Sequence, residues 1–370
     1  MKFICFLNSY SQGISGGDAC FVNFSKIVST RDNFLIVTSK LGSKLCRQNK
    51  IRGKYILTSN ETQFSNTILT YIFRTIRALR ILSKQTNNEI IYSTSDFIPD
   101  VLPAFLLKTK NPQSVWVQKI FHIIPKSRLI PHFFQLISFQ LIRHLADLVV
   151  LDNYDLEKTL KQKYGFAKVN TITIPPGINL KEFKKTKRYS RKISAAFMGQ
   201  LRKSKGIFDL VPIWKKVVKT YPKATLIVIG KDINNNASVL NRQIESEGLS
   251  SNIIVMGFLS ESRARSIIKT ANLFVLPSYE EGFGIVILEA MALSTQPIAY
   301  NLPVYKANFP GCVMTAPLGD HQAMAELIVK HLKHNKPRVF TKVVKQYNLP
   351  ELVEKEYQQI KKIYEKNASR

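Results

Sequence analysis

Cysteine is scarce in this sequence and is not arranged for a metal site or a disulfide framework. Four cysteines occur in 370 residues, and they lie far apart in the chain. They are Cys5, Cys20, Cys46 and Cys312. Because no C-x-x-C pair and no histidine-rich cluster accompanies them, we expect neither a zinc site nor a fold stapled by disulfides. The expected environment is a reducing compartment.

Long uncharged apolar runs are also missing. The run nearest to a membrane span, residues 129–142, is interrupted by Pro131, Gln135 and Gln140. A spanning helix needs about 18 or more apolar residues. The first apolar run, in the amino-terminal segment MKFICFLNSYSQG, is too short for the apolar region of a signal peptide. We therefore expect a protein that is soluble or peripheral to a membrane.

Acidic residues are few relative to basic ones. The chain has 54 Lys and Arg against 25 Asp and Glu, a formal net charge of +29. Such an excess suits an anionic membrane surface, a polyanionic substrate or nucleic acid. Since no recognised nucleic-acid-binding motif occurs, nucleic acid is the least favoured of these partners.

Carboxylates are absent altogether between Asp100 and Asp147. The cations of this segment are Lys108, Lys110, Lys119, Lys126, Arg128 and Arg143, and its aromatic residues include Trp116, Phe121, Phe133, Phe134 and Phe139. This composition is typical of a surface that binds anionic lipid, at about 1 kcal/mol per cation near the membrane. A solvated basic face over a buried helix is the alternative.

A second group of cations recurs at helical spacing earlier in the chain. It consists of Arg74, Arg77, Arg80 and Lys84, which alternate with the apolar residues Ile72, Phe73, Ile76, Leu79 and Leu82. The spacing predicts a helix with its cations on one side and its core face on the other.

Strands and helices alternate along the chain. The strands expected in the first half are residues 3–7, 34–38, 55–57, 90–93, 114–118 and 148–151, with helices near 65–85 and 99–107. Such alternation predicts an α/β fold with a parallel sheet covered on both faces. The pattern restarts at residue 193, and 370 residues exceed what one core usually serves. We therefore expect two domains.

The domain boundaries follow from composition. We expect a first domain over residues 1–180 and a second over residues 193–348. Residues 181–192 carry seven basic residues and one acidic residue, a composition suited to an exposed linker. A last long helix is expected within residues 349–370.

The glycine loop after the first strand lacks a dinucleotide-binding fingerprint. Gly16 and Gly17 precede a helix, but no G-x-G-x-x-G occurs and no acidic residue follows the strand at residues 34–38. A dinucleotide cofactor is therefore disfavoured.

The most informative stretch is PSYEEGFGIVILEAMA, residues 277–292. Glu281 and Glu289 flank the turn of residues 282–284, which follows an apolar strand and opens an apolar helix. Free amides at the helix start suit a phosphate, the glycines allow a close approach, and the carboxylates can accept from hydroxyls. The stretch thus predicts a site for a phosphate that carries polyol groups. A plain loop and core helix with solvated acids is the alternative.

The frame PS…EGFG…LEAMA closely resembles the E-x7-E signature of the large retaining glycosyltransferase family numbered four. The resemblance is specific over residues 193–330 and looser before them. It implies the GT-B fold, in which two Rossmann-like domains face each other across a cleft and the carboxyl-terminal helix, here within residues 349–370, returns to the first domain. The first domain would take the acceptor and face the membrane, and the second would bind a nucleotide sugar.

The resemblance also implies roles for individual residues. Glu281 would orient the transferred sugar, Glu289 would hold the ribose hydroxyls, and Lys205 would bind the donor's diphosphate. The family's usual arginine after the loop's first glycine, Gly199, is Gln200 in this chain, so Arg202 is the expected substitute, with Lys203 as a competitor. Further residues expected at the site are Gly16 and Gly17 near the donor phosphates, His122 beside the sugar, Gly257 and Phe258 around the base, and Gly282, Phe283, Gly284 and Ile285 at the helix start.

The expected function is transfer of a sugar, taken to be a hexose, from a UDP- or GDP-sugar to a glycan or lipid-linked glycan. The chain contains no D-x-D, so a metal-dependent route has no support in the sequence, and neither a cofactor nor a metal is expected. The expected location is cytoplasmic, on the inner face of a membrane. A noncatalytic glycan- or lipid-binding module of the same fold and a basic nucleic-acid binder are the alternatives.

Overall fold

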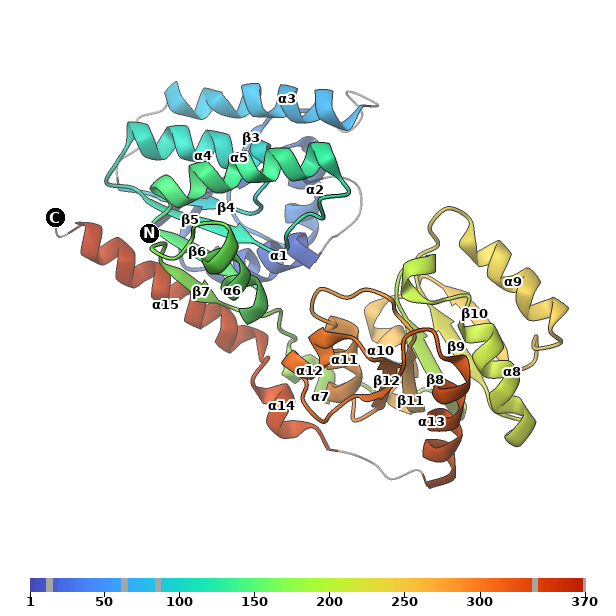
Figure 1. Cartoon of the computed structure of the whole chain (residues 1–370). Helices are drawn as coiled ribbons and strands as arrows, with labels where there is room; N and C mark the ends of the chain where they lie inside the picture. The colour runs from blue at the N-terminus through green and yellow to red at the C-terminus, as the bar shows by residue number, and fades with distance from the viewer. Residues whose placement is uncertain (11–15, 61–65, 84–87, 335–338, 369–370) are drawn as a thin grey trace. The chain divides into compact units, whose positions relative to one another are not determined.

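A computed structural model describes residues 1–10, 16–60, 66–83, 88–334 and 339–368 of the chain. It divides into two compact units (Figure 1). The first comprises Met1–Pro176 together with Leu349–Arg370, and the second comprises Gly177–Asn348.

The first unit is built on a parallel sheet with strand order β3-β2-β1-β4-β5-β6-β7. Its strands are β1 (Lys2–Leu7), β2 (Asn33–Thr38), β3 (Lys54–Leu57), β4 (Ile90–Ser93), β5 (Val115–Ile120), β6 (Leu148–Leu151) and β7 (Thr171–Thr173). Its helices are α1 (Gly16–Val28), α2 (Lys40–Gln48), α3 (Thr67–Ala78), η1 (Leu79–Ser83), α4 (Ile98–Lys110), α5 (Leu129–Leu145), α6 (Tyr154–Lys163) and α15 (Leu349–Ala368). One apolar cluster joins the sheet to α1, α2 and α15, and another joins it to η1, α4, α5 and α6. The sheet is therefore covered on both faces, as its apolar strands predict.

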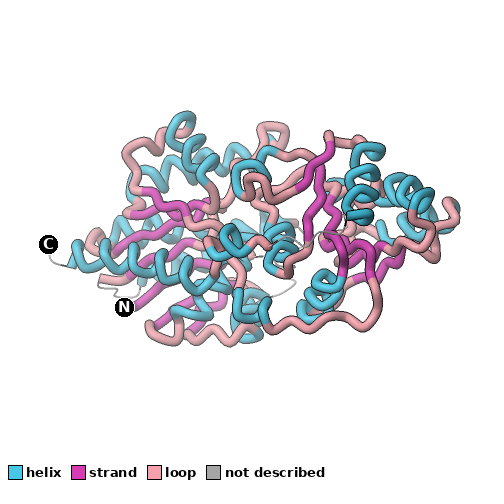
Figure 2. Tube along the Cα trace, turned by 90° about the horizontal axis from the view of Figure 1, so that it is seen from below, coloured by secondary structure: helices cyan, strands magenta, loops and turns pink. Residues whose placement is uncertain are grey.

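The second unit repeats this plan with strand order β10-β9-β8-β11-β12-β13, again all parallel. Its strands are β8 (Ile193–Met198), β9 (Leu226–Ile229), β10 (Ile253–Gly257), β11 (Ala271–Leu276), β12 (Gln296–Tyr300) and β13 (Met314–Ala316). Its helices are α7 (Leu180–Lys184), η2 (Lys203–Lys205), α8 (Leu210–Thr220), α9 (Asn236–Ser246), α10 (Glu261–Thr270), α11 (Ile285–Ala292), α12 (Pro303–Asn308), α13 (His321–His334) and α14 (Thr341–Lys345). The tube view in Figure 2 shows strands and helices alternating along the chain.

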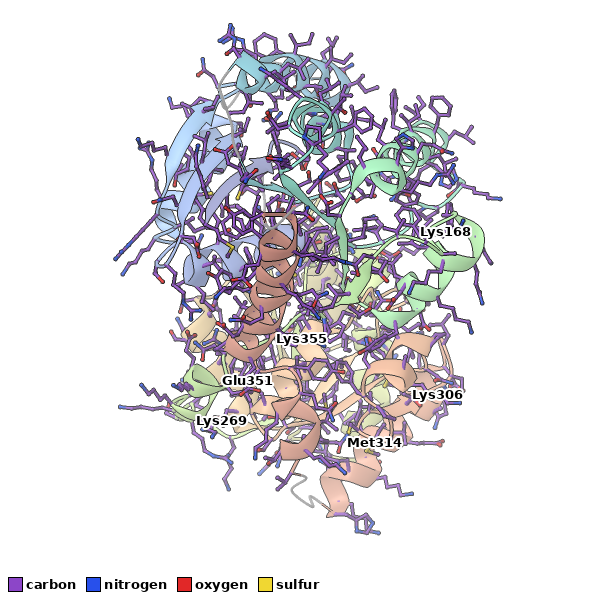
Figure 3. The ribbon with its side chains drawn as sticks, turned by 90° about the vertical axis from the view of Figure 1, so that its left-hand side faces the viewer. Lys168, Lys269, Lys306, Met314, Glu351 and Lys355 are labelled. Carbon is purple, nitrogen blue, oxygen red and sulfur yellow. The ribbon has the colours of Figure 1, made fainter. Side chains whose placement is uncertain are left out.

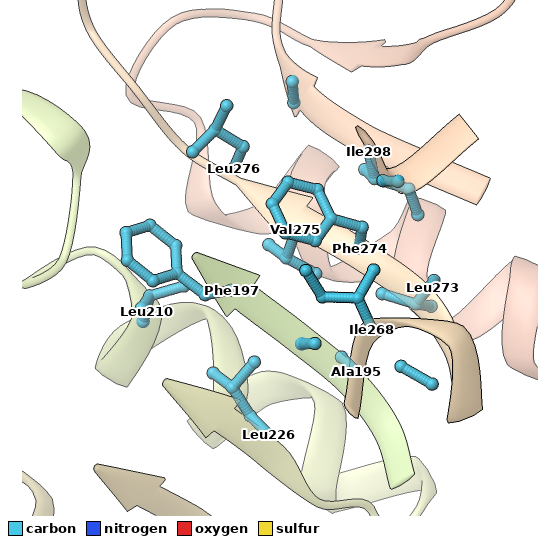
Figure 4. Packing of buried hydrophobic residues seen from close by; sticks show 14 of the residues in the cluster. Ala195, Phe197, Leu210, Leu226, Ile268, Leu273, Phe274, Val275, Leu276 and Ile298 are labelled. Atoms are coloured by element: carbon cyan, nitrogen blue, oxygen red, sulfur yellow. The ribbon is translucent and has the colours of Figure 1, made fainter. Parts of the chain in front are cut away.

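Strand β11 lies at the centre of the second unit and fixes the place of the loop that follows it. It pairs with β8 on one side and β12 on the other, and Leu273 to Leu276 are fully buried (Figure 4). A parallel strand buried on both faces must be apolar throughout, which explains this run. Residues 277–284 are thereby held at the carboxyl edge of the sheet.

The last helix, α15, packs on the first unit. Leu352, Val353 and Ile360 are buried in the cluster that also contains α1, whereas Glu351 and Lys355 lie on the exposed side of the helix (Figure 3). This helical period of burial explains why the segment folds as an amphipathic helix. The predicted fold class is confirmed: two Rossmann-like domains, with the carboxyl-terminal helix on the first.

Residues 181–192 belong to the second unit. Phe183 of α7 is buried in that unit's core, and the Arg265 guanidinium lies 4.5 Å from the centre of its ring. The segment was expected to be an exposed linker because of its basic composition, but part of it packs on the second unit.

Candidate functional site

Helix α11 starts at a glycine that its surroundings require. Gly284 precedes the helix with φ 87°, and a Cβ there would lie 3.0 Å from the Tyr305 ring. Both the left-handed backbone and the close ring disfavour a side chain. The amide of Ile287 donates to the carbonyl of Gly284 over 2.9 Å, whereas the two amides before it have no acceptor one turn earlier in the helix, so they can bind an anion.

The glycine-rich loop after β8 packs against the loop after β11. Gly206 has φ 68°, and a Cβ at this position would lie 1.8 Å from the carbonyl oxygen of Pro277. The amide of Tyr279 donates to the carbonyl of Ser204 over 2.9 Å. The two loops that the sequence predicted to bind phosphate therefore form one continuous surface.

The expected catalytic residues of the second unit meet on this surface. Lys205 Nζ lies 2.8 Å from Glu281 Oε1 and donates to the carbonyl of Glu280 over 3.2 Å. Arg202 Nη2 lies 3.4 Å from the exposed Glu280 carboxylate. Lys203, the competitor of Arg202, is exposed. Each cation thus pairs with a carboxylate of the loop that leads into α11.

Glu289, on the second turn of α11, is partly exposed. Burial raises the pKa of its carboxyl to about 7, and the positive charge of Arg265 opposes this shift. The carboxyl is therefore close to half ionised near neutral pH and can accept hydrogen bonds from ligand hydroxyls when it is ionised.

The predicted turn residues differ in their surroundings. The Phe283 side chain is buried against Phe309 and Tyr347, with ring centres 5.5 and 5.4 Å away, so it anchors the loop and does not face a ligand. Gly282 is exposed with open space around its α-carbon, and Ile285 is half-buried in the first turn of α11.

Three more glycines shape the same edge of the sheet. Gly230 closes β9 so tightly that a Cβ would lie 1.7 Å from the carbonyl oxygen of Gly199, and its amide donates to Gly257 over 2.9 Å. Gly257 itself has φ 66°. Phe258 follows it and is highly exposed, so its ring is free to contact a flat ligand group.

Asp209 was not predicted from the sequence, yet it holds the two loops together. Its Oδ2 accepts from the Tyr279 hydroxyl over 2.6 Å and from the Tyr300 hydroxyl over 2.7 Å, and His321 Nε2 lies 3.3 Å away. The hydrogen bond to Asp209 raises the pKa of Tyr279. These four residues are spread over more than a hundred positions without a motif, so only the fold brings them together.

The expected site residues of the first unit also meet at the carboxyl edge of their sheet. Gly16 and Gly17 begin α1, and a Cβ at Gly17 would lie 2.7 Å from the Phe121 ring. His122 follows β5 and is exposed, and its carbonyl accepts from Gln135 over 2.9 Å. The polar loop before Gly16, residues 11–15, lies outside the described residues.

Two buried acids, Asp96 and Asp100, and the half-buried Asp152 lie near this edge as well. Burial raises the pKa of Asp96, against a hydrogen bond from Gln135 and the charge of His122. It raises the pKa of Asp100 to about 6 and that of Asp152 to about 7. Asp100 accepts from the amides of Asn8 and Ser9 over 2.6 and 3.1 Å. It therefore fixes the loop that leads towards α1.

The expected orientation of the basic helix in residues 65–85 is wrong. Arg74 is buried and donates to the carbonyls of Asn8 and Tyr10 over 3.1 and 2.6 Å, whereas Ile72 and Ile76 are exposed. Arg74 points inward because the loop after β1 offers carbonyl acceptors that satisfy its guanidinium. Lys84 lies outside the described residues.

The expected interfacial segment between Asp100 and Asp147 is divided between core and surface. Trp116, Phe139, Lys108 and Lys119 are buried, so the prediction is wrong for these four. Lys108 Nζ is 2.8 Å from Asp147 Oδ2, and Lys119 Nζ is 2.9 Å from a carboxylate oxygen of α15. The exposed members are Lys110, Lys126, Arg128, Phe133, Phe134 and Arg143, and Phe121 is half-buried.

No group of three or more His, Cys, Asp or Glu side chains in the part of the chain that the structure describes could hold a metal ion. Within the same residues, no helix is long and apolar enough to cross a membrane.

Comparison with known proteins gives concordant matches. The model of the family described as Glycosyl transferases group 1 matches residues 179–343. The alpha-monoglucosyldiacylglycerol synthase of Acholeplasma laidlawii is 24% identical over 369 residues, which cover 90% of this chain and 88% of that protein. The GDP-mannose:cellobiosyl-diphosphopolyprenol alpha-mannosyltransferase of Xanthomonas oryzae is 28% identical over 109 residues, which cover 30% of this chain and 29% of that protein.

Solved structures of similar fold cover nearly the whole chain. Anabaena HepE, in complex with UDP and glucose, has a TM-score of 0.76 at 15% identity and covers 98% of this chain and 100% of its own. The sucrose-phosphate synthase of Thermosynechococcus elongatus has a TM-score of 0.75 at 15% identity, with coverages of 98% and 99%. At this identity the likeness bears on the fold alone.

Proposed function

This chain is a glycosyltransferase of the group 1 family, and from that premise we propose that it moves a hexose from a UDP- or GDP-sugar to a glycan or lipid-linked glycan. We propose that the reaction retains the anomeric configuration and needs no metal. The observation that carries the proposal is the pair of Lys205 and Glu281, whose charged atoms are 2.8 Å apart beside the start of α11.

The chemistry of this surface suits departure of a nucleoside diphosphate. The first amides of α11 bind one phosphate, and the side chains of Arg202 and Lys205 neutralise the other. Negative charge grows on the diphosphate as the bond to the sugar breaks, so fixed cations and amides stabilise the transition state more than the bound donor. The sequence has no D-x-D, and these cations take the part that a metal ion plays elsewhere.

The two glutamates have separate parts in the proposal. Glu281 accepts from Lys205 and is thereby fixed in place, which suits a group that orients the transferred sugar. Glu289 lies on the second turn of α11 and would accept from the ribose hydroxyls. His122 and the Gly16-Gly17 turn belong to the first unit, where we propose that the acceptor binds.

An apolar surface on the first unit supports the proposal that the acceptor is bound to a membrane. Helices α3 and α5 both pack against α4 (Figure 1). Both expose large apolar side chains. These are Ile68, Leu69, Ile72 and Ile76 on α3 and Leu129, Ile130, Phe133, Phe134 and Leu136 on α5. Lys126 and Arg128 are exposed just before α5.

Apolar side chains beside cations are the composition of a surface that enters the headgroup region of an anionic bilayer. Two similar proteins have lipids in their names: one is a synthase of alpha-monoglucosyldiacylglycerol, and the other is a mannosyltransferase named for a cellobiosyl-diphosphopolyprenol. We propose a cytoplasmic protein bound to the inner face of the membrane.

The test is transfer by the purified chain with a panel of UDP-, GDP- and ADP-sugars, with and without membrane extract and with and without a chelator. Turnover that needs the extract and survives chelation supports the proposal. Binding of a donor without transfer or hydrolysis would indicate a noncatalytic module. Affinity for polynucleotide alone, lost steeply with salt, would indicate a nucleic-acid binder. Absence of binding to every nucleotide sugar would overturn the proposal.

A further inference from the structure

Residues 181–192, which include most of α7 and lead into β8, carry a local excess of positive charge on the second unit. This basic segment has seven basic residues and one acidic residue. All seven basic side chains are exposed, and none forms an ion pair or a hydrogen bond with any described residue. They are Lys181, Lys184, Lys185, Lys187, Arg188, Arg191 and Lys192.

The one acidic residue of the basic segment does not offset this charge. Glu182 accepts from Arg265 Nη1 over 3.0 Å and from the side-chain amide of Asn179 over 3.0 Å. Its carboxylate is therefore already paired with a guanidinium of α10, outside the segment. The seven cations repel one another in the free protein, and an anionic partner would relieve this repulsion.

The backbone of the basic segment is fixed to the second unit at every third residue. Phe183 is buried in the core of that unit. The carbonyl of Thr186 accepts from Lys269 Nζ over 2.6 Å. The amide of Tyr189 donates to the hydroxyl of Thr270 over 2.6 Å. Four of the cations occupy the positions between these anchors, so a fixed backbone presents them to solvent and loses little entropy when they bind a partner.

The composition of the basic segment favours an anionic lipid surface as that partner. No large apolar side chain within residues 181–192 is highly exposed, so contact is made by charge alone. Clusters of four to eight Lys and Arg are typical of proteins that bind anionic lipid headgroups. Surfaces that bind single-stranded nucleic acid add exposed aromatic rings, on which the bases stack, and the basic segment exposes none.

We propose that the basic segment is a docking surface for the headgroups of anionic lipids, through which the second unit binds a membrane by charge. This docking is separate from that of the apolar residues of α3 and α5 on the first unit. The proposal rests on the proposed function, which places the chain at a membrane. Each cation in contact with the headgroups is worth about a fivefold change in affinity.

The test removes four of the cations from the full chain and measures cosedimentation with vesicles of equal parts phosphatidylglycerol and phosphatidylcholine. The segment variant combines Lys184→Gln, Lys185→Gln, Lys187→Gln and Arg188→Gln. Its affinity at physiological salt should be at least about 20-fold lower than that of the wild type. Its melting temperature should stay the same or rise, because repulsion between the cations is reduced.

A matched control removes the same charge from scattered positions of the second unit. It combines Lys219→Gln, Lys223→Gln, Arg242→Gln and Lys330→Gln, all at exposed positions that form no ion pair with another described residue. Its affinity should stay within about threefold of the wild type. Equal weakening of both variants would show that only the charge of the whole chain acts, and it would overturn the proposal. So would equal binding of the wild type to neutral and anionic vesicles.

Lysine acetylation of the wild type examines the same surface without any substitution. In the presence of anionic vesicles the lysines of the basic segment should react several-fold more slowly, and Lys219 and Lys223 should react at unchanged rates. Vesicle binding without protection of the basic segment, or with equal protection of all these lysines, would overturn the proposal.

Nucleic acid is the competing partner. Tighter binding of DNA than of anionic vesicles, lost in the segment variant, would make the segment a nucleic-acid surface and overturn the proposal. Calorimetry with nucleotide sugars on the same proteins separates this inference from the proposed function. A wild type that docks on vesicles but binds no nucleotide sugar would overturn the proposed sugar transfer. A wild type that binds a nucleotide sugar but no anionic vesicle would overturn the docking surface alone.

Discussion

At the scale of single residues, two adjacent glutamates have opposite surroundings. The Glu281 side chain is 11% exposed and bonded to Lys205, whereas the Glu280 side chain is 63% exposed. Adjacent positions with the same chemistry thus provide a matched pair, in which one carboxylate is held at the proposed reaction centre and the other is mainly in water.

We expect Glu281→Gln to reduce sugar transfer by about a hundredfold or more, the usual cost of losing a group that holds the reacting atoms in place. The affinity for the nucleoside diphosphate should stay the same or increase, because Lys205 loses its carboxylate partner and becomes fully available to phosphate. Initial rates of transfer and calorimetric titration with UDP and GDP measure both effects.

Glu280→Gln is the control and should keep the transfer rate within about threefold, since an exposed carboxylate interacts weakly with its neighbours. Equal rates for Glu281→Gln and wild type would refute the role given to Glu281. Loss of nucleotide binding by Glu281→Gln would show that the substitution damaged the diphosphate site itself.

Glu289 gives a prediction about pH. Its carboxyl has a pKa of about 7 in the free protein, and ribose hydroxyls donate to the ionised form. Binding of the donor therefore favours release of a proton, and affinity should rise by about tenfold between pH 6 and pH 8. An intact nucleotide sugar must be used, because its diphosphate carries constant charge over this range. In Glu289→Gln the affinity should be independent of pH.

The same carboxyl affects stability in the opposite direction. Its pKa in the folded protein, about 7, lies above the ordinary value of 4.5, so the folded state binds more protons between these values. The free energy of unfolding should therefore fall as pH rises from about 4.5 to 7 and should fall less in Glu289→Gln.

For the affinity measurement, a donor affinity that falls from pH 6 to pH 8 would contradict the assignment of Glu289 to the ribose.

At the scale of elements, α15 is joined to the first unit by a buried ion pair. Glu356 accepts from Lys119 over 2.9 Å and from the Tyr92 hydroxyl over 2.7 Å, and all three side chains are buried. Removing one partner of such a pair strands a charge in the core, at a cost of about 3–5 kcal/mol.

We expect Glu356→Ala to lower the free energy of unfolding of the first unit by about this amount. Glu354→Ala, which removes a more exposed pair with Arg31 at 2.7 Å, should cost less than about 1 kcal/mol. Each unit contains one tryptophan, Trp116 in the first and Trp214 in the second. Fluorescence of Trp214→Phe proteins therefore follows the first unit alone. A similar cost for both substitutions would contradict the importance of the buried pair.

Elements differ in how far the sequence predicted them. The strand and helix around residues 277–292 were predictable because a buried parallel strand, a glycine turn and an apolar helix each leave a local pattern. Helix α3 was predictable as a helix, but not in its orientation. A helical period of cations and apolar residues does not show which side of the helix faces the core. In α3 the buried side is the one that carries Arg74, because carbonyls in a distant loop accept hydrogen bonds from its guanidinium.

Some parts of the candidate site could likewise be predicted from the sequence, and others could not. Lys205 and Glu281 were predictable because each lies in a motif. The bond between Asp209 and Tyr279 was not, because its two partners lie far apart in the sequence and on separate elements. Contacts of this kind arise from tertiary packing and leave no period or spacing in the sequence.

At the scale of the whole molecule, a net charge of +29 adds a long-range attraction to any anionic surface. This attraction weakens as salt shortens the screening length to about 8 Å at physiological ionic strength. The exposed apolar residues of α3 and α5 would act differently, because burial of apolar surface in a bilayer is not screened by salt. Charge and apolar contact can therefore be separated by experiment.

We expect the wild-type chain to bind vesicles that contain anionic lipid and to bind less tightly as salt is raised, without complete loss. Ile76 and Phe133 are 62% and 60% exposed, so replacing both by serine should leave the fold intact. The double variant should bind at least about tenfold more weakly in high salt, where the apolar contribution dominates. Cosedimentation with vesicles at several salt concentrations measures both contributions.

Val339→Ser is the matched control, since Val339 is 79% exposed but belongs to the second unit. It should bind vesicles as the wild type does. If the double variant also bound like the wild type at every salt concentration, net charge alone would explain membrane association, and the apolar faces of α3 and α5 would need another partner. If the wild type bound neutral and anionic vesicles equally, the excess of basic residues would have no part in docking. A weaker double variant with an unchanged salt dependence is thus the result that assigns docking to these two helices and long-range attraction to the charge of the whole chain.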